Sequence, residues 1–70
     1  MKKKEMIKQL VLEWVRNSVD QQQRTERFIG HDALESRIDR NWTKEGIESH
    51  YDRWNRGEEN IETTIKELRR

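Results

Sequence analysis

Residues 47–68, IESHYDRWNRGEENIETTIKEL, decide the fold of this chain. Large apolar side chains recur here at alternating spacings of three and four, which place them on one face of an α-helix. The members of this stripe are Ile47, Tyr51, Trp54, Ile61, Ile65 and Leu68. The stripe is interrupted once, at Glu58, directly after Gly57. We therefore predict helices that pack together through the stripe.

The interruption at Gly57 and Glu58 allows two interpretations. One continuous helix would satisfy the spacing and would form an extended, coiled-coil-like hairpin. A glycine followed by two acidic residues is instead typical of one helix ending and another beginning. The second interpretation is favoured, and it predicts two helices jointed at Gly57 within a compact bundle.

The remainder of the chain also predicts helices. It has no proline and no alternating strand pattern, so residues 1–70 are expected to form a single all-α domain. A long first helix is expected from about Lys3 to about Phe28, with Val19 on its apolar face and Gly30 just beyond its end. The chain is therefore predicted to be a small bundle of three to four helices.

The second and third helices of this bundle have recognisable start signals. Asp32 followed three positions later by Glu35 resembles a capping box, which predicts a short second helix beginning near Ala33. Asn41 or Thr43 would cap the third helix.

Composition makes the predicted core small. Hydrophobic residues make up 30% of the chain and charged residues 41%, and there is no cysteine to form a disulfide. Small scaffolds without disulfides commonly gain stability from a metal or from self-association, so a homodimer is expected. The core or dimer contacts from the first helix are expected to be Ile7, Leu10, Val11 and Trp14, in addition to the stripe.

The hydropathy and charge of the chain indicate where it is located and which partners it disfavours. No apolar run approaches the length of a membrane span, and the basic N-terminus lacks the apolar region of a signal peptide, so we expect a cytoplasmic protein. The formal net charge is +1, and acidic and basic residues are interspersed beyond the first helix. This pattern argues against a broad nucleic-acid footprint.

No catalytic constellation is evident, so the chain is not expected to be an enzyme. Ser49 and His50 are adjacent and therefore diverge on a helix, which prevents a nucleophile–base pair. His31 with Glu35 is a weak metal pair without a further histidine or cysteine, so no metal or cofactor is expected. Both histidines are expected at the surface.

Protein-binding contacts are expected from residues outside the apolar stripe. Trp42 stands at a helix joint, where it either closes the core or serves as an exposed binding anchor. Leu12 lies off the apolar face of the first helix. Four arginines recur at three-residue spacing in two pairs, Arg37, Arg40, Arg53 and Arg56.

One stretch resembles a known family. The sequence NWTKE at 41–45, followed by Trp54, Gly57 and the apolar residues to Leu68, is similar to the first two helices of a Myb/SANT-type DNA-binding domain. In that family a third helix enters the major groove, and here that helix would have to follow Arg70. The resemblance implies DNA binding through residues 33–70 as an alternative function.

The function that the sequence favours is binding to another protein. We expect a small non-catalytic regulator or inhibitor, of the kind that phages and other mobile elements encode, which acts by steric occlusion of a host protein. The alternatives are a DNA-binding transcriptional regulator, whose affinity would fall steeply with salt, and a structural oligomer component.

Overall fold

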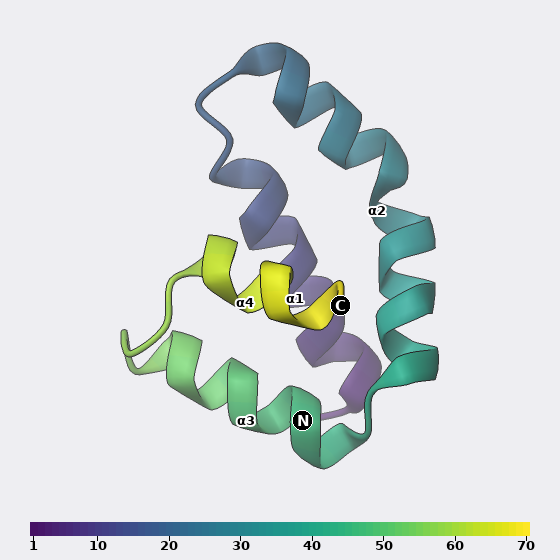
Figure 1. Ribbon diagram of the computed structural model, residues 1–70, viewed down its shortest axis with the longest axis vertical. Helices are drawn as coiled ribbons and strands as arrows, with labels where there is room; N and C mark the ends of the chain where they lie inside the picture. Colours follow the sequence, from purple (N-terminus) through teal and green to yellow (C-terminus); the bar gives the residue numbers. More distant parts are fainter.

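The computed structural model describes all 70 residues, Met1 to Arg70, and is entirely helical. The elements are α1 (Lys3–Arg16), α2 (Gln21–Asn41), α3 (Lys44–Asn55) and α4 (Ile61–Leu68). Helix α1 packs against each of the other three, and Figure 1 shows α4 crossing it in the middle of the molecule. The predicted all-α bundle of three to four helices is confirmed.

The joint between the last two helices lies at Gly57, as predicted. Gly57 has a φ of +80°, a left-handed conformation that glycine adopts without steric cost. The N–H of Glu58 then donates to the carbonyl of Arg53 at 2.9 Å and closes the end of α3. Asn60 caps α4 by accepting a hydrogen bond from the N–H of Thr63 at 2.8 Å. The stripe therefore folds as two helices.

The predicted boundary between the first two helices is wrong. Helix α1 ends at Arg16, and α2 runs from Gln21 to Asn41 through Gly30 without a break. Asp20 caps α2 by accepting hydrogen bonds from two backbone N–H groups, of which the shorter, from Gln22, measures 2.8 Å.

Polar side chains explain why the chain turns at residues 17–20. The hydroxyl of Ser18 donates to the carbonyl of Asp20, and the guanidinium of Arg24 donates to the carbonyl of Ser18, both at 2.9 Å. These local bonds replace helical ones. Val19, predicted on the apolar face, is fully exposed in this turn.

The capping box predicted at Asp32 and Glu35 does not start a helix, because both residues lie inside α2. Of the two candidate caps for α3, Thr43 occupies the cap position, and its hydroxyl accepts a hydrogen bond from the N–H of Gly46 at 3.2 Å. The second helix is therefore the longest one, and the first is shorter than predicted.

The core lies between α1, α3 and α4, and α2 adds only Ile38 to it as a fully buried side chain. Trp14, Tyr51 and Trp54 are partly buried and pack against this cluster. The buried members are Met6, Ile7, Leu10, Val11, Ile38, Ile47, Ile61, Ile65 and Leu68.

Candidate functional site

Helix α2 is the element with the most unburied surface. It is 21 residues long, lies along one edge of the molecule and packs mainly against α1 (Figure 1). Two of its apolar side chains are strongly exposed, Phe28 at 59% and Ile29 at 77%. A chain with few apolar residues thus places two large ones in solvent on one helix, which makes α2 the candidate binding element.

Hydrogen bonds fix the antiparallel register of α1 and α2. The ammonium of Lys3 donates to the carbonyl of Asp39 at 2.6 Å, and the guanidinium of Arg27 donates to the carbonyl of Trp14 at 2.9 Å. One contact lies near each end of the pair. The exposed apolar residues of α2 are therefore held at a defined position on α1.

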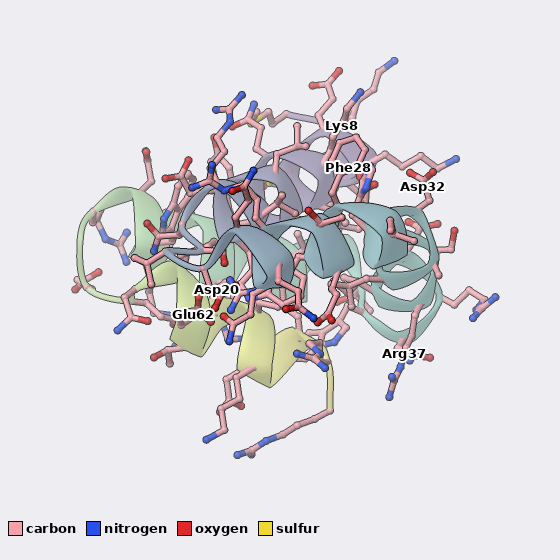
Figure 2. The ribbon with its side chains drawn as sticks, turned by 90° about the horizontal axis from the view of Figure 1, so that it is seen from above. Lys8, Asp20, Phe28, Asp32, Arg37 and Glu62 are labelled. Carbon is pink, nitrogen blue, oxygen red and sulfur yellow. The ribbon has the colours of Figure 1, made fainter.

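Phe28 lies on the same side of the molecule as Lys8 and Asp32, as Figure 2 shows. Leu12 follows Lys8 by one helical turn, so it belongs to the same side of α1, and it is half-buried. We call these four residues the Phe28 surface. It combines two apolar side chains with one basic and one acidic group.

A groove of about 540 Å³ continues from the Phe28 surface between α1 and α2. Its walls carry both signs of charge, with Ile7 as the single apolar contributor. The lining residues are Lys4, Ile7, Lys8, Asp32, Glu35, Ser36, Asp39 and Arg40. This mixture suits a polar protein surface better than a phosphate backbone, which would meet three carboxylates.

His31, Asp32 and Glu35 are the groups that come nearest to a metal site. Their ligand atoms lie within 4.8 Å of one another, with the imidazole Nε2 at 3.1 Å from Asp32 and 3.8 Å from Glu35. All three come from adjacent turns of one helix, and the imidazole Nδ1–H donates to the carbonyl of Phe28. Lys4 and Lys8 line the same groove as the two carboxylates, which disfavours a cation there.

The structure places Trp42 between the ends of α2 and α4. Its indole N–H donates to the carbonyl of Leu68 at 3.1 Å, and its ring packs edge-on against His50 with centroids 5.3 Å apart. The side chain is half-buried against the core. Its contacts are thus mainly within the chain, although its exposed part is still open to a partner.

The four arginines predicted as contacts are not brought together. Arg37 and Arg40 lie on α2, where they line two different grooves. Arg53 lies 3.3 Å from the carboxylate of Glu59, and Arg56 donates to Glu58 at 2.6 Å. Two of the four therefore have intrachain carboxylate partners, and no continuous basic face forms.

His50, predicted at the surface, is buried with 8% of its area exposed. Its imidazole Nδ1 lies 2.9 Å from the carboxylate of Glu59, which closes the gap between α3 and the α3–α4 turn. Burial acts to raise the pKa of Glu59, but hydrogen bonding by Thr64 and His50 and the charges of His50 and Arg53 outweigh it and lower that pKa. This cluster is part of the packing.

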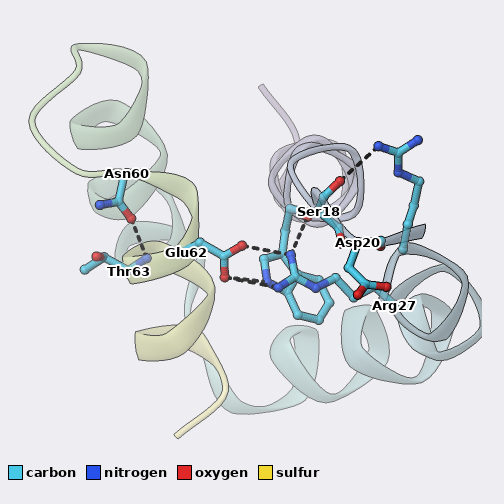
Figure 3. Close-up of polar contacts among 8 residues, drawn as sticks. Ser18, Asp20, Arg27, Asn60, Glu62 and Thr63 are labelled. Atoms are coloured by element: carbon cyan, nitrogen blue, oxygen red, sulfur yellow. Dashed lines mark hydrogen bonds and ion pairs between the residues drawn. The ribbon is translucent and has the colours of Figure 1, made fainter. Parts of the chain in front are cut away.

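On the side of α2 away from the Phe28 surface, Trp14 and Glu62 form a second polar cluster. The carboxylate of Glu62 accepts hydrogen bonds from Arg27 at 2.8 Å and from the Trp14 indole at 3.2 Å (Figure 3). The Arg27 guanidinium also stacks over the Trp14 ring at 4.5 Å from its centre. This cluster ties α1, α2 and α4 together.

Comparisons of the chain with protein-family models, curated proteins and solved structures find no match. None of the four helices combines the length and apolar character that a membrane crossing requires.

Sequence reasoning missed Phe28 and Ile29 as surface residues. Phe28 enters the prediction only as the approximate end of the first helix, and Ile29 has no role in it. The available signal was the weak amphipathic pattern of residues 21–41, in which apolar residues do not share one face.

Proposed function

We propose that this chain is a non-catalytic protein-binding regulator or inhibitor that contacts its target through the Phe28 surface. The single observation that carries the proposal is the 59% exposure of Phe28, on the side of the molecule that Lys8 and Asp32 also occupy. Covering the exposed part of a phenylalanine contributes roughly 1–2 kcal/mol to an association, which is the contribution of an interface anchor.

The surroundings of Phe28 match the usual composition of a protein interface. An apolar centre is bordered by Lys8 and Asp32, and the groove beyond it offers further charges of both signs. Binding would block the target sterically, as small proteins encoded by phages and other mobile elements do in the cytoplasm of their hosts. The opposite side of α2 stays free for self-association.

The alternative of DNA binding is less well supported. DNA contacts would come from residues 33–70, and within this segment both Arg53 and Arg56 lie beside carboxylates of their own chain. A phosphate backbone would have to compete with Glu58 and Glu59 for these two arginines.

The test begins with a pull-down of the tagged protein from its native host, with identification of what co-purifies in stoichiometric amounts. Affinity for that target is then measured for Phe28→Ala and for the matched control Val19→Ala. Val19 is fully exposed in the α1–α2 turn, outside the Phe28 surface. We expect Phe28→Ala to weaken binding about tenfold, whereas Val19→Ala leaves it unchanged.

Two outcomes would reject the proposal. One is a target affinity that Phe28→Ala leaves within about twofold of the wild type, well below the effect of a lost anchor. The other is retention of the chain on DNA that falls steeply with salt, combined with the absence of any protein target.

A further inference from the structure

A second groove runs along the side of α2 opposite to Phe28. It has a volume of about 310 Å³ and lies between α2, the ring of Trp14 and the last residues of the chain. The lining residues are Trp14, Glu26, Arg27, Gly30, Ala33, Leu34, Arg37 and Arg69. In Figure 2, Arg37 and Glu62 lie on the side away from Phe28. We call this hollow the Arg37 groove.

One wall of the groove is a narrow stripe of α2. Glu26, Gly30, Ala33 and Arg37 follow one another at spacings of four, three and four, which keeps them within about 60° of the helix circumference. The stripe extends for about 16 Å along the helix axis. It is acidic at one end, small in the middle and basic at the other end.

The charges at the two ends of this stripe have no partners within the chain. Neither Glu26 nor Arg37 takes part in any of the intrachain ion pairs, and the same holds for Arg69 across the groove. The remaining arginine of the groove, Arg27, is already paired with Glu62 at 2.8 Å. The groove thus presents one acidic group and two basic groups that form no ion pair within the chain.

Gly30 in the middle of the stripe has no explanation within the chain. It lies inside a helix, and a side-chain carbon added there would meet no atom within 4 Å. Glycine at such a position costs about 0.5–1 kcal/mol relative to alanine. The absence of a side chain at Gly30, with the small Ala33 one turn on, is what the close approach of another helix requires.

We propose that the Arg37 groove is the contact surface between two copies of this chain, with the α2 helices antiparallel across a twofold axis. In that arrangement Glu26 of each copy faces Arg37 of the other, and Gly30 faces Ala33, because each pair is symmetric about the same midpoint. An acidic segment of another protein would satisfy Arg37 but would leave Glu26 facing like charge. A second copy satisfies both ends.

The partner helix also covers surface beyond α2. It would lie against the Trp14 ring and beside Arg69, whose guanidinium stands 5.5 Å from the centre of that ring. A specific dimer must cover about 600 Å² on each chain, roughly an eighth of the 4923 Å² that this chain exposes. An interface of this minimum size lies at the lower end of specific protein interfaces, where weak and transient associations are found.

The experiment measures oligomeric state by sedimentation at low salt for the full chain and for two charge reversals. Glu26→Arg and Arg37→Glu each place like charges at both ends of the interface, so each variant alone should dimerise at least about tenfold more weakly. An equimolar mixture of the two variants restores both opposite-charge pairs. It should dimerise as well as the wild type.

Steric variants provide a second measurement. Ala33→Gln fills the middle of the stripe and should abolish the dimer, whereas Ser36→Gln, at an exposed position in the first groove, should not. Circular dichroism and thermal unfolding of both variants check that each still folds.

Three outcomes would overturn the inference. They are a wild-type chain that stays monomeric up to about 1 mM, a dimer that both charge reversals leave intact, and a mixture of the reversed variants that stays monomeric. None of these outcomes bears on the target of the Phe28 surface, because the two surfaces lie on opposite sides of α2 and Phe28→Ala should leave the dimer intact.

Discussion

Glu59 is the side chain whose charge the fold uses most directly. It is 11% exposed, accepts from His50 at 2.9 Å and lies 3.3 Å from the Nε of Arg53. The contact between Glu59 and Arg53 is electrostatic, because the buried Nε of Arg53 has no aligned hydrogen-bond acceptor. A carboxylate in this position stabilises the α3–α4 turn only while it is ionised.

We expect Glu59→Gln to destabilise the fold by about 1–2 kcal/mol at neutral pH, because the amide loses the charged contacts to His50 and Arg53. The pKa of Glu59 is lowered in the folded state. Its contribution is therefore complete above the unfolded value of about 4.3 and is lost as the pH falls through the folded value. Urea unfolding, followed by tryptophan fluorescence, should show the difference between wild type and variant shrinking below about pH 4. A difference independent of pH would contradict this prediction.

Trp42 poses a different question at the residue scale, namely how much of its role is structural. We expect Trp42→Phe to lower the free energy of unfolding by roughly 1–2 kcal/mol, because it removes the hydrogen bond to the Leu68 carbonyl and leaves a cavity. Trp54→Phe is the matched control, since the Trp54 indole makes no hydrogen bond and packs edge-on against Tyr51. Equal losses for both variants would show that the Trp42 hydrogen bond contributes little.

At the scale of the elements, two helical glycines occupy opposite environments. A side-chain carbon at Gly30 would meet open space, whereas one at Gly46 would come within 2.9 Å of the Trp42 ring. We expect Gly30→Ala to stabilise the monomer by about 0.5–1 kcal/mol and Gly46→Ala to destabilise it despite the same gain in helix propensity. Thermal unfolding at low protein concentration measures both. Destabilisation by Gly30→Ala would mean that α2 is not regular at this point.

The start of α2 depends on Asp20, which holds the helix end at the turn after α1. We expect Asp20→Ala to cost about 1 kcal/mol, because two backbone N–H groups lose their acceptor. Asp20→Asn should keep most of this stability, since the amide oxygen still accepts. Chemical denaturation of both variants tests whether the cap or the charge matters, and equal losses would assign the effect to charge.

The elements also show what could be predicted from sequence. The stripe from Ile47 to Leu68 and the joint at Gly57 were predictable because the end signals at Gly57 coincide with the one gap in the apolar spacing, at Glu58. At residues 17–20 the apolar spacing does not mark the end of the helix. Val19 continues this spacing, and three glutamines that favour helix follow it. The turn forms because Ser18, Asp20 and Arg24 bond to one another, and because folding α2 back buries Ile38. Spacing alone does not reveal such bonds.

The candidate site was predictable only in part for the same reason. Leu12 was predicted as a contact from its position off the apolar face, which depends on α1 alone. Phe28 and Arg37 lie on opposite sides of α2 because this helix continues through Gly30, where the predicted boundary placed the two residues on separate helices. His50 was expected in solvent because nothing local predicts the carboxylate of Glu59 beside it.

At the scale of the whole molecule, the chain is as compact as an ordinary folded monomer. Its accessible surface of 4923 Å² compares with about 4,700 Å² expected for a monomer of its mass. Its radius of gyration of 11.4 Å compares with about 11 Å for its length. The proposed self-association through α2 would therefore join chains that are already folded.

Burial is nevertheless uneven across the molecule, and this predicts a gradient of stability. Residues 21–33 of α2 contribute no buried side chain, whereas α1, α3 and α4 each contribute at least two. Backbone amides in residues 24–33 should therefore exchange with solvent through local opening, and those of α1 only through global unfolding.

At concentrations where the proposed dimer forms, exchange in residues 24–33 should slow selectively, because the partner helix covers this segment. Hydrogen exchange measured at two protein concentrations tests both statements, and uniform protection across α1 and α2 at the lower concentration would contradict the first.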